Sequence, residues 1–75
     1  MRKIELAFGE VVRTRRVKLG LSQEAFADKV GIHRTYVSSI ELGKVKVSIG
    51  VAHDLAVALG LPLSKLFQDV ERTAQ

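Results

Sequence analysis

What the 75-residue sequence lacks excludes several kinds of chemistry. It has no cysteine, so disulfides and thiolate metal sites are ruled out. Its two histidines are separated in the chain, and it has neither a glycine-rich phosphate loop nor carboxylates paired for acid–base chemistry. No stretch approaches the roughly 20 apolar residues that span a bilayer, and the N-terminus lacks the features of a signal peptide. We therefore expect a cytoplasmic protein that is not an enzyme and that binds no metal, cofactor, small-molecule ligand or membrane.

The composition is that of one small folded domain with an uneven charge distribution. An apolar fraction of 47% is ample for a core, and the length allows a single domain over residues 1–75, with its core at about 4–70. The net charge is +4. Residues 1–20 hold six basic and two acidic side chains, whereas residues 47–75 hold two basic and three acidic ones. This asymmetry suits a module with one side facing a polyanion, although a merely solvated basic surface would look the same.

The middle of the chain, Ser22–Gly43, reads as two short helices joined by a tight turn. The first helix is predicted at about 22–30 and the second at about 34–42. Ser22 is a good N-cap because its hydroxyl can accept a hydrogen bond from a free amide of the first turn. Gly31 stands where the chain must turn sharply, a position that favours positive φ. The apolar residues at helical spacing are expected to face inward, and they are Phe26, Ala27, Val30, Val37 and Ile40.

Three further helices are predicted around this pair. Apolar spacing indicates a first helix over 4–18, and Ser48 can cap another over 49–59. A last helix is predicted over 63–70, and the polar tail 71–75 is expected to fray. Because no segment alternates as a strand would, the fold class is predicted to be all-α, a compact five-helix bundle.

The spacing of particular residues in the central pair points to a known family. The pattern Q-x3-A-x3-G-x5-V-S-x-I-E-x-G begins at Gln23 and ends at Gly43, and it resembles the helix-turn-helix of the Cro and phage-repressor (XRE-like) type. The resemblance covers roughly residues 8–68, and HRTYVSSIE (33–41) is especially similar to the controller proteins of restriction–modification systems. It implies a lambda-repressor-like five-helix domain. It also implies a salt bridge between Arg16 and Glu41, although a solvated Glu41 is the alternative.

The resemblance further implies that the second helix of the motif enters the major groove of DNA. Arg34 is the best candidate for a base contact because its guanidinium can bond guanine O6 and N7 together, although it could clamp a phosphate instead. Thr35, Ser38 and Ser39 are expected on the same outward face. Tyr36 is assigned to the base-contacting set too, with packing against the rest of the motif as an equal alternative.

A second group of residues is predicted to contact DNA phosphates. Gln23 begins the first helix of the motif, where a side chain and free amides suit an anion. His33 is expected to cap the second helix and to touch a phosphate. Lys44, Lys46 and the capping Ser48 form a further phosphate-facing cluster, and a solvated loop is the alternative for them.

One domain of this kind reads too few base pairs for useful affinity, so the family acts as two-fold dimers. The last helix is more apolar than a small monomer should expose, and Phe67 is expected to belong to the core. The remaining apolar residues are predicted to form the dimer interface with Leu61 and Val57, and they are Leu63, Leu66 and Val70.

The predicted function is therefore that of a homodimeric, sequence-specific regulator of transcription on a palindromic or pseudopalindromic double-stranded DNA operator. A controller of restriction–modification genes is its specific version. Two alternatives stay open at this point: an antitoxin that binds both DNA and a toxin, and a protein-interaction module that has kept the fold.

Overall fold

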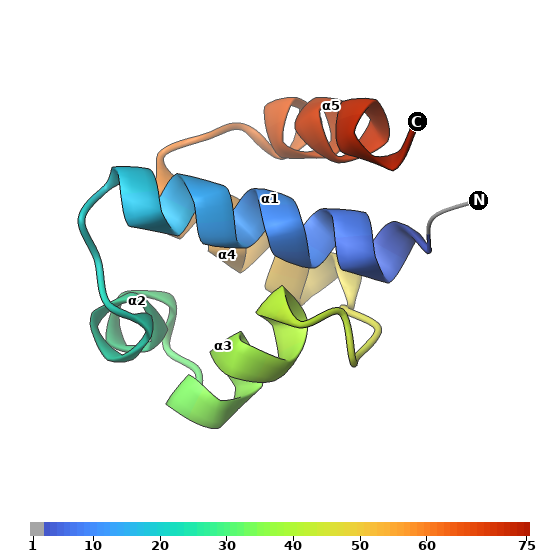
Figure 1. Ribbon diagram of the computed structural model, residues 1–75. Helices are drawn as coiled ribbons and strands as arrows, with labels where there is room; N and C mark the ends of the chain where they lie inside the picture. The colour runs from blue at the N-terminus through green and yellow to red at the C-terminus, as the bar shows by residue number, and fades with distance from the viewer. Residues whose placement is uncertain (1–2) are drawn as a thin grey trace.

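Five α-helices and no strand are formed by residues 3–75, the part of the chain that the computed structural model describes (Figure 1). The all-α, five-helix prediction is confirmed. In chain order the helices are α1 (Ile4–Lys18), α2 (Gln23–Val30), α3 (Arg34–Glu41), α4 (Ile49–Leu59) and α5 (Leu63–Ala74).

Helix α1 is the central element against which the others are arranged (Figure 1). Helix α5 packs along one side of α1, α2 and α3 lie on the opposite side, and α4 lies behind. All five helices contribute to one hydrophobic core, whose largest fully buried side chains include Val12, Phe26, Ile40, Leu55 and Leu66. No single described helix is long and apolar enough to cross a bilayer.

The helix ends follow the local signals in the sequence. Ser22 Oγ accepts a hydrogen bond from the Ala25 amide at 3.0 Å, and Ser48 Oγ accepts one from the Val51 amide at 3.1 Å. Each hydroxyl thereby satisfies one amide that the first helical turn leaves free. Gly31 ends α2 with φ of 90°, the left-handed conformation that glycine adopts most readily. The predicted boundaries of the helix-turn-helix are therefore set by hydrogen bonds within a few residues.

The last helix is longer than predicted. It continues to Ala74, whereas the sequence was expected to fray after residue 70. Two contacts hold the additional turn: Ala74 packs partly on the core, and Arg72 lies 3.8 Å from the Asp69 carboxylate, one turn back along α5. Arg15 of α1 also binds Asp69, and this hydrogen bond lowers the pKa of the Asp69 carboxyl.

The inward face of α5 also differs from the prediction. Leu66 and Val70 are buried within a single chain, whereas Phe67 is 38% exposed. Leu66 and Val70 meet α5's neighbours, α1 and α4, so they cannot present an apolar surface to a second copy. This corrects the prediction that Leu66 and Val70 form the dimer interface and that Phe67 is a core residue. Leu63 is half-buried against the same core.

Helix α1 comes unusually close to the end of α3 at Gly9. A Cβ placed on Gly9 would lie 2.3 Å from the Ile40 carbonyl oxygen and 2.7 Å from that of Glu41. Glycine in mid-helix costs about 1 kcal/mol relative to alanine. Because Gly9 has no Cβ, the backbones of α1 and α3 can come into contact here, and any larger residue would prevent that contact.

We expect Gly9→Ala to lower the free energy of unfolding by about 1–2 kcal/mol in urea denaturation. Overpacking of up to about 3 kcal/mol would outweigh the roughly 1 kcal/mol that alanine adds to a helix. The matched control is Gly50→Ala in α4, where the nearest atom to the new Cβ is Ser48 Oγ at 3.9 Å. That variant should be as stable as the parent or slightly more so. Equal behaviour of the two variants would contradict the close approach of α1 and α3.

Candidate nucleic-acid interface

Helix α3 lies on the side of α1 opposite α5 (Figure 1), and its polar residues are exposed or half-buried, apart from the buried Glu41. Arg34 and Thr35, in its first turn, are exposed. Ser38 and Ser39 follow one turn later and are half-buried. Val37 and Ile40 of the same helix are buried in the core and hold α3 in place. The structure thus brings together the residues predicted to read bases, with the first turn most accessible.

Tyr36 differs from its neighbours on α3. Its side chain is half-buried and packs against the hydrophobic core. Of the two interpretations left open for Tyr36, packing within the motif is the one that the structure favours.

His33 caps α3 with its imidazole ring. His33 Nδ1 accepts a hydrogen bond from the Thr35 amide at 3.0 Å, and the residue is exposed. Because Nδ1 is occupied by this cap bond, Nε2 is the ring nitrogen left to face a ligand. Because phosphate oxygens accept hydrogen bonds, the free Nε2–H suits a DNA backbone contact at the start of α3.

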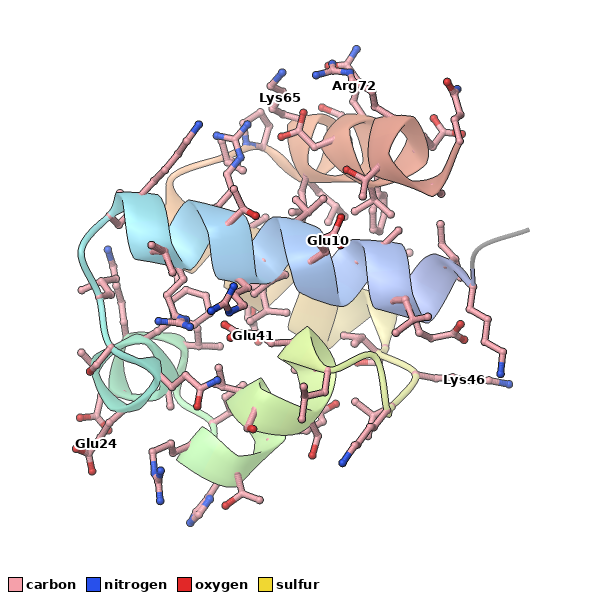
Figure 2. The ribbon with its side chains drawn as sticks, viewed as in Figure 1. Glu10, Glu24, Glu41, Lys46, Lys65 and Arg72 are labelled. Carbon is pink, nitrogen blue, oxygen red and sulfur yellow. The ribbon has the colours of Figure 1, made fainter. Side chains whose placement is uncertain are left out.

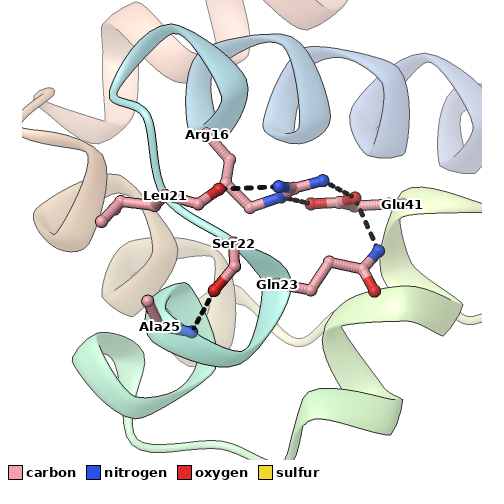
Figure 3. Close-up of polar contacts among 6 residues, drawn as sticks. All are labelled: Arg16, Leu21, Ser22, Gln23, Ala25 and Glu41. Atoms are coloured by element: carbon pink, nitrogen blue, oxygen red, sulfur yellow. Dashed lines mark hydrogen bonds and ion pairs between the residues drawn. The ribbon is translucent and has the colours of Figure 1, made fainter.

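A buried hydrogen-bond network joins three segments behind α3 (Figure 3). Arg16 Nε and Nη2 donate to the two Glu41 carboxylate oxygens at 2.7 and 2.9 Å, and Arg16 Nη1 donates to the Leu21 carbonyl at 2.8 Å. Gln23 Nε2 donates to Glu41 Oε1 at 3.0 Å. The Glu41 carboxylate, by accepting these bonds, raises the pKa of the Arg16 guanidinium. Arg16 and Glu41, the pair implied by the family resemblance, thereby connect α1, α2 and the end of α3.

The network also defines what Gln23 can do. One of its two amide N–H bonds is directed at Glu41, and the side chain is half-buried. The second N–H is left for a phosphate, so the predicted backbone contact at Gln23 stays a prediction. A side chain held at one end is a better-placed donor than a free one, because less rotational freedom is lost on binding.

The loop after α3 holds the remaining predicted phosphate contacts. Lys44 and Lys46 are exposed, and Lys46 reaches outward (Figure 2). Ser48 Oγ accepts the cap bond of α4, and its O–H can still donate to a phosphate. Lys3 was not among the predicted residues, and it lines one cleft with Lys44 and Lys46, beside the carboxylates of Glu5 and Glu71. No local signal could have found it, because Lys3 lies about forty residues away in the chain and only the packing of α1 against the loop brings them together.

Exposed apolar side chains gather at another place on the surface. A groove of about 380 Å³ lies between the start of α1, the loop before α4, and α5. Ile4, Ile49 and Phe67 line it and are 53%, 75% and 38% exposed. Among the residues first predicted for the dimer interface, Val57 is 62% exposed but does not line this groove.

Two short helices joined by a tight turn, with a polar exposed start to the second, are the features of a helix-turn-helix protein. Residues 12–66 match the family model described as helix-turn-helix. The chain belongs to this family, in its Cro and phage-repressor branch.

Within the family the chain is similar to proteins named as control or controller proteins. It is 42% identical over 73 residues to control protein C.MunI of Mycoplasma sp., an alignment that covers 96% of this chain and 99% of that protein. The crystal structure of the restriction–modification controller protein C.AhdI from Aeromonas hydrophila is 38% identical, with a TM-score of 0.81 over 84% of this chain and 96% of that one. The controller C.Esp1396I, solved as a tetramer on its natural 35 base-pair operator, shares the fold at 22% identity, with a TM-score of 0.88 over 99% of this chain and 97% of that one.

We expect Glu41→Ala to destabilise the protein by about 3–5 kcal/mol, because it leaves the Arg16 guanidinium buried without its carboxylate. Urea denaturation followed by circular dichroism measures the loss. Glu24→Ala is the matched control, since Glu24 is exposed and points away from the body of the protein (Figure 2). A loss at Glu41 no larger than that at Glu24 would show that the network does not hold the helices together.

Proposed function

We propose that the chain is a sequence-specific, double-stranded DNA-binding regulator of transcription that acts as a homodimer. One observation carries the proposal: α3 presents Arg34 and Thr35 at an exposed first turn, while the buried Arg16–Glu41 pair holds the far end of the same helix. A recognition helix must be both accessible and fixed in position if its side chains are to meet base edges. Its place of action would be the cytoplasm, at the chromosome.

Direct readout is assigned to α3. Arg34 would bond guanine O6 and N7 in the major groove, and Thr35 would offer its methyl group to thymine or its hydroxyl to another base. Ser38 and Ser39, one turn further along, have short side chains and would contact only bases that lie close to the helix. Tyr36 would act through packing rather than by touching a base, because its side chain already packs against the core.

Phosphate contacts are assigned to both flanks of α3. Gln23 at the start of α2 and His33 at the start of α3 would each donate one N–H to a phosphate of the DNA backbone. Lys44 and Lys46 would do so beyond the end of α3, with Ser48 donating its O–H, and Lys3 lies at the same cleft as the two lysines. Contacts of this kind set the register of the protein on DNA without reading sequence.

A second copy of this chain is proposed to cover the groove lined by Ile4, Ile49 and Phe67. Single exposed apolar side chains are ordinary, but these three come from separate segments that meet at one place, which is the pattern of an interface. A two-fold dimer would place two α3 helices on half-sites about one helical turn of DNA apart.

The finer proposal is that the regulated genes belong to a restriction–modification system. The similarity to C.MunI supports it, because the alignment spans nearly all of both chains. Gene neighbourhood tests it: an adjacent endonuclease or methyltransferase gene supports the proposal, and an adjacent toxin gene would favour the antitoxin alternative.

We expect Arg34→Ala to weaken operator binding by about 1–3 kcal/mol and to relax the base preference at one position, because a bidentate base contact is lost. Titration of a set of operator variants by fluorescence anisotropy measures both effects. Lys46→Ala is the contrasting variant: it should weaken binding to all sequences alike and make the salt slope shallower by about 1. If Arg34→Ala instead weakened binding equally on every sequence, Arg34 would be a phosphate contact.

We expect Ile49→Glu to convert the dimer to a folded monomer in analytical ultracentrifugation, because it places a charge inside the proposed apolar interface. Val17→Glu is the control, since Val17 is 55% exposed on α1 and does not line the groove. Circular dichroism of both variants would verify that the fold is kept. A dimer that survives Ile49→Glu would place the interface elsewhere.

A further inference from the structure

A second cluster of basic residues lies on the side of the molecule opposite α3. Helices α1 and α5 form a cleft of about 240 Å³ there, to which Arg15 and Lys18 contribute from α1 and Arg72 from α5. Lys65 stands beside it, and Figure 2 shows Lys65 and Arg72 extending outward on the far side of α1 from α3. If α3 lies in the major groove of the operator, these residues face away from that duplex.

The Asp69 carboxylate forms ion pairs with three of these cations. Asp69 binds the Arg15 guanidinium, and its Oδ1 atom lies 3.4 Å from Lys65 Nζ and 3.8 Å from Arg72 Nη1. The Asp69 side chain is 12% exposed, so the cations lie between the carboxylate and the solvent. A single negative charge does not neutralise three positive ones, and Lys18 lines the same cleft.

The cleft has a small net positive charge. Its lining holds three cations, Arg15, Lys18 and Arg72, and two carboxylates, Glu10 and Asp69, and Lys65 beside Asp69 adds one more positive charge. Concentrated like charges repel one another, and an external anion would relieve that repulsion. The cationic groups thus form a place where an anion would bind favourably.

The remaining lining indicates which kind of anion fits. Two hydroxyl groups, those of Thr14 and Thr73, lie in the cleft with the guanidinium groups, and Val11 is the one apolar residue among its lining. A protein partner would need an apolar centre to its interface, whereas phosphate oxygens need donors and positive charge. Guanidinium and hydroxyl groups are the usual donors to a DNA backbone.

We propose that the α1–α5 cleft binds the phosphate backbone of a second DNA segment while α3 occupies the operator. The proposal rests on the proposed function, since it concerns a protein already bound to DNA. Each protomer would then contact DNA on two opposite faces, and the dimer would hold two segments together.

A capture experiment with two duplexes tests this inference. The full-length dimer is bound to an immobilised operator duplex, and a fluorescent duplex without an operator is added at low ionic strength. The wild-type protein should retain the second duplex. Arg72→Glu should reduce its retention by about fivefold or more, since it reverses a charge at the cleft, and operator affinity should stay within about twofold. Failure of the first binding step would count against the proposed function and not against the cleft.

Arg13→Glu supplies the matched control, because Arg13 is an exposed residue of α1 that does not line the cleft. It makes the same change in total charge and should leave most of the retention intact. Equal losses for the two variants would overturn the proposal, as would a wild-type protein that captures no second duplex. Release of the second duplex by polyglutamate, but not by an equal charge of single-stranded DNA, would overturn it too, in favour of an acidic protein partner.

Discussion

The buried ion pair between Arg16 and Glu41 is the interaction on which the arrangement of the helices depends. Removing two charges from water is costly, and the Coulombic attraction offsets that cost only when the geometry is good and the other donors are satisfied. Both conditions hold: the guanidinium meets the carboxylate with two parallel bonds, and its third donor reaches the Leu21 carbonyl. The pair contributes a defined geometry more than net stability. It is the reason that the end of α3, the start of α2 and the last turn of α1 have one relative position.

Gly9 makes that geometry possible. The ion pair can form only if α1 and the end of α3 approach closely, and a side chain at Gly9 would strike the carbonyl oxygens of Ile40 and Glu41. Gly9 and the ion pair therefore act together: the glycine admits the backbone at the end of α3, and the ion pair fixes that approach with directed bonds. Because α3 is held at its buried end, its first turn can be polar and exposed without loss of position. The fixed end and the proposed recognition surface thus lie at opposite ends of one short helix.

Opposite faces of the molecule carry different chemistry. The side of α3 has hydrogen-bonding groups and scattered lysines, the groove between α1, α4 and α5 is apolar, and the α1–α5 cleft is basic around Asp69. The basic N-terminal third of the sequence is divided between these faces. Arg16 is buried in the core network, Arg15 holds α5, and Lys3 stands with the lysines after α3. A net charge of +4 alone would have hidden that division.

The helices and the helix-turn-helix could be predicted from the sequence because their signals are local. A capping serine, a glycine with positive φ and apolar residues at helical spacing act within a few residues, and the structure places the ends of α2 and α4 accordingly. Which residues of an apolar helix face become buried depends on the helix that packs against it, and hydrophobic spacing does not identify that helix. For that reason Leu66 and Phe67 were assigned to the wrong sides of α5. Lys3 and Lys46 line one cleft, and Arg15 is hydrogen-bonded to Asp69. The residues of each pair are about forty or more positions apart, so only tertiary packing could decide that they lie close together.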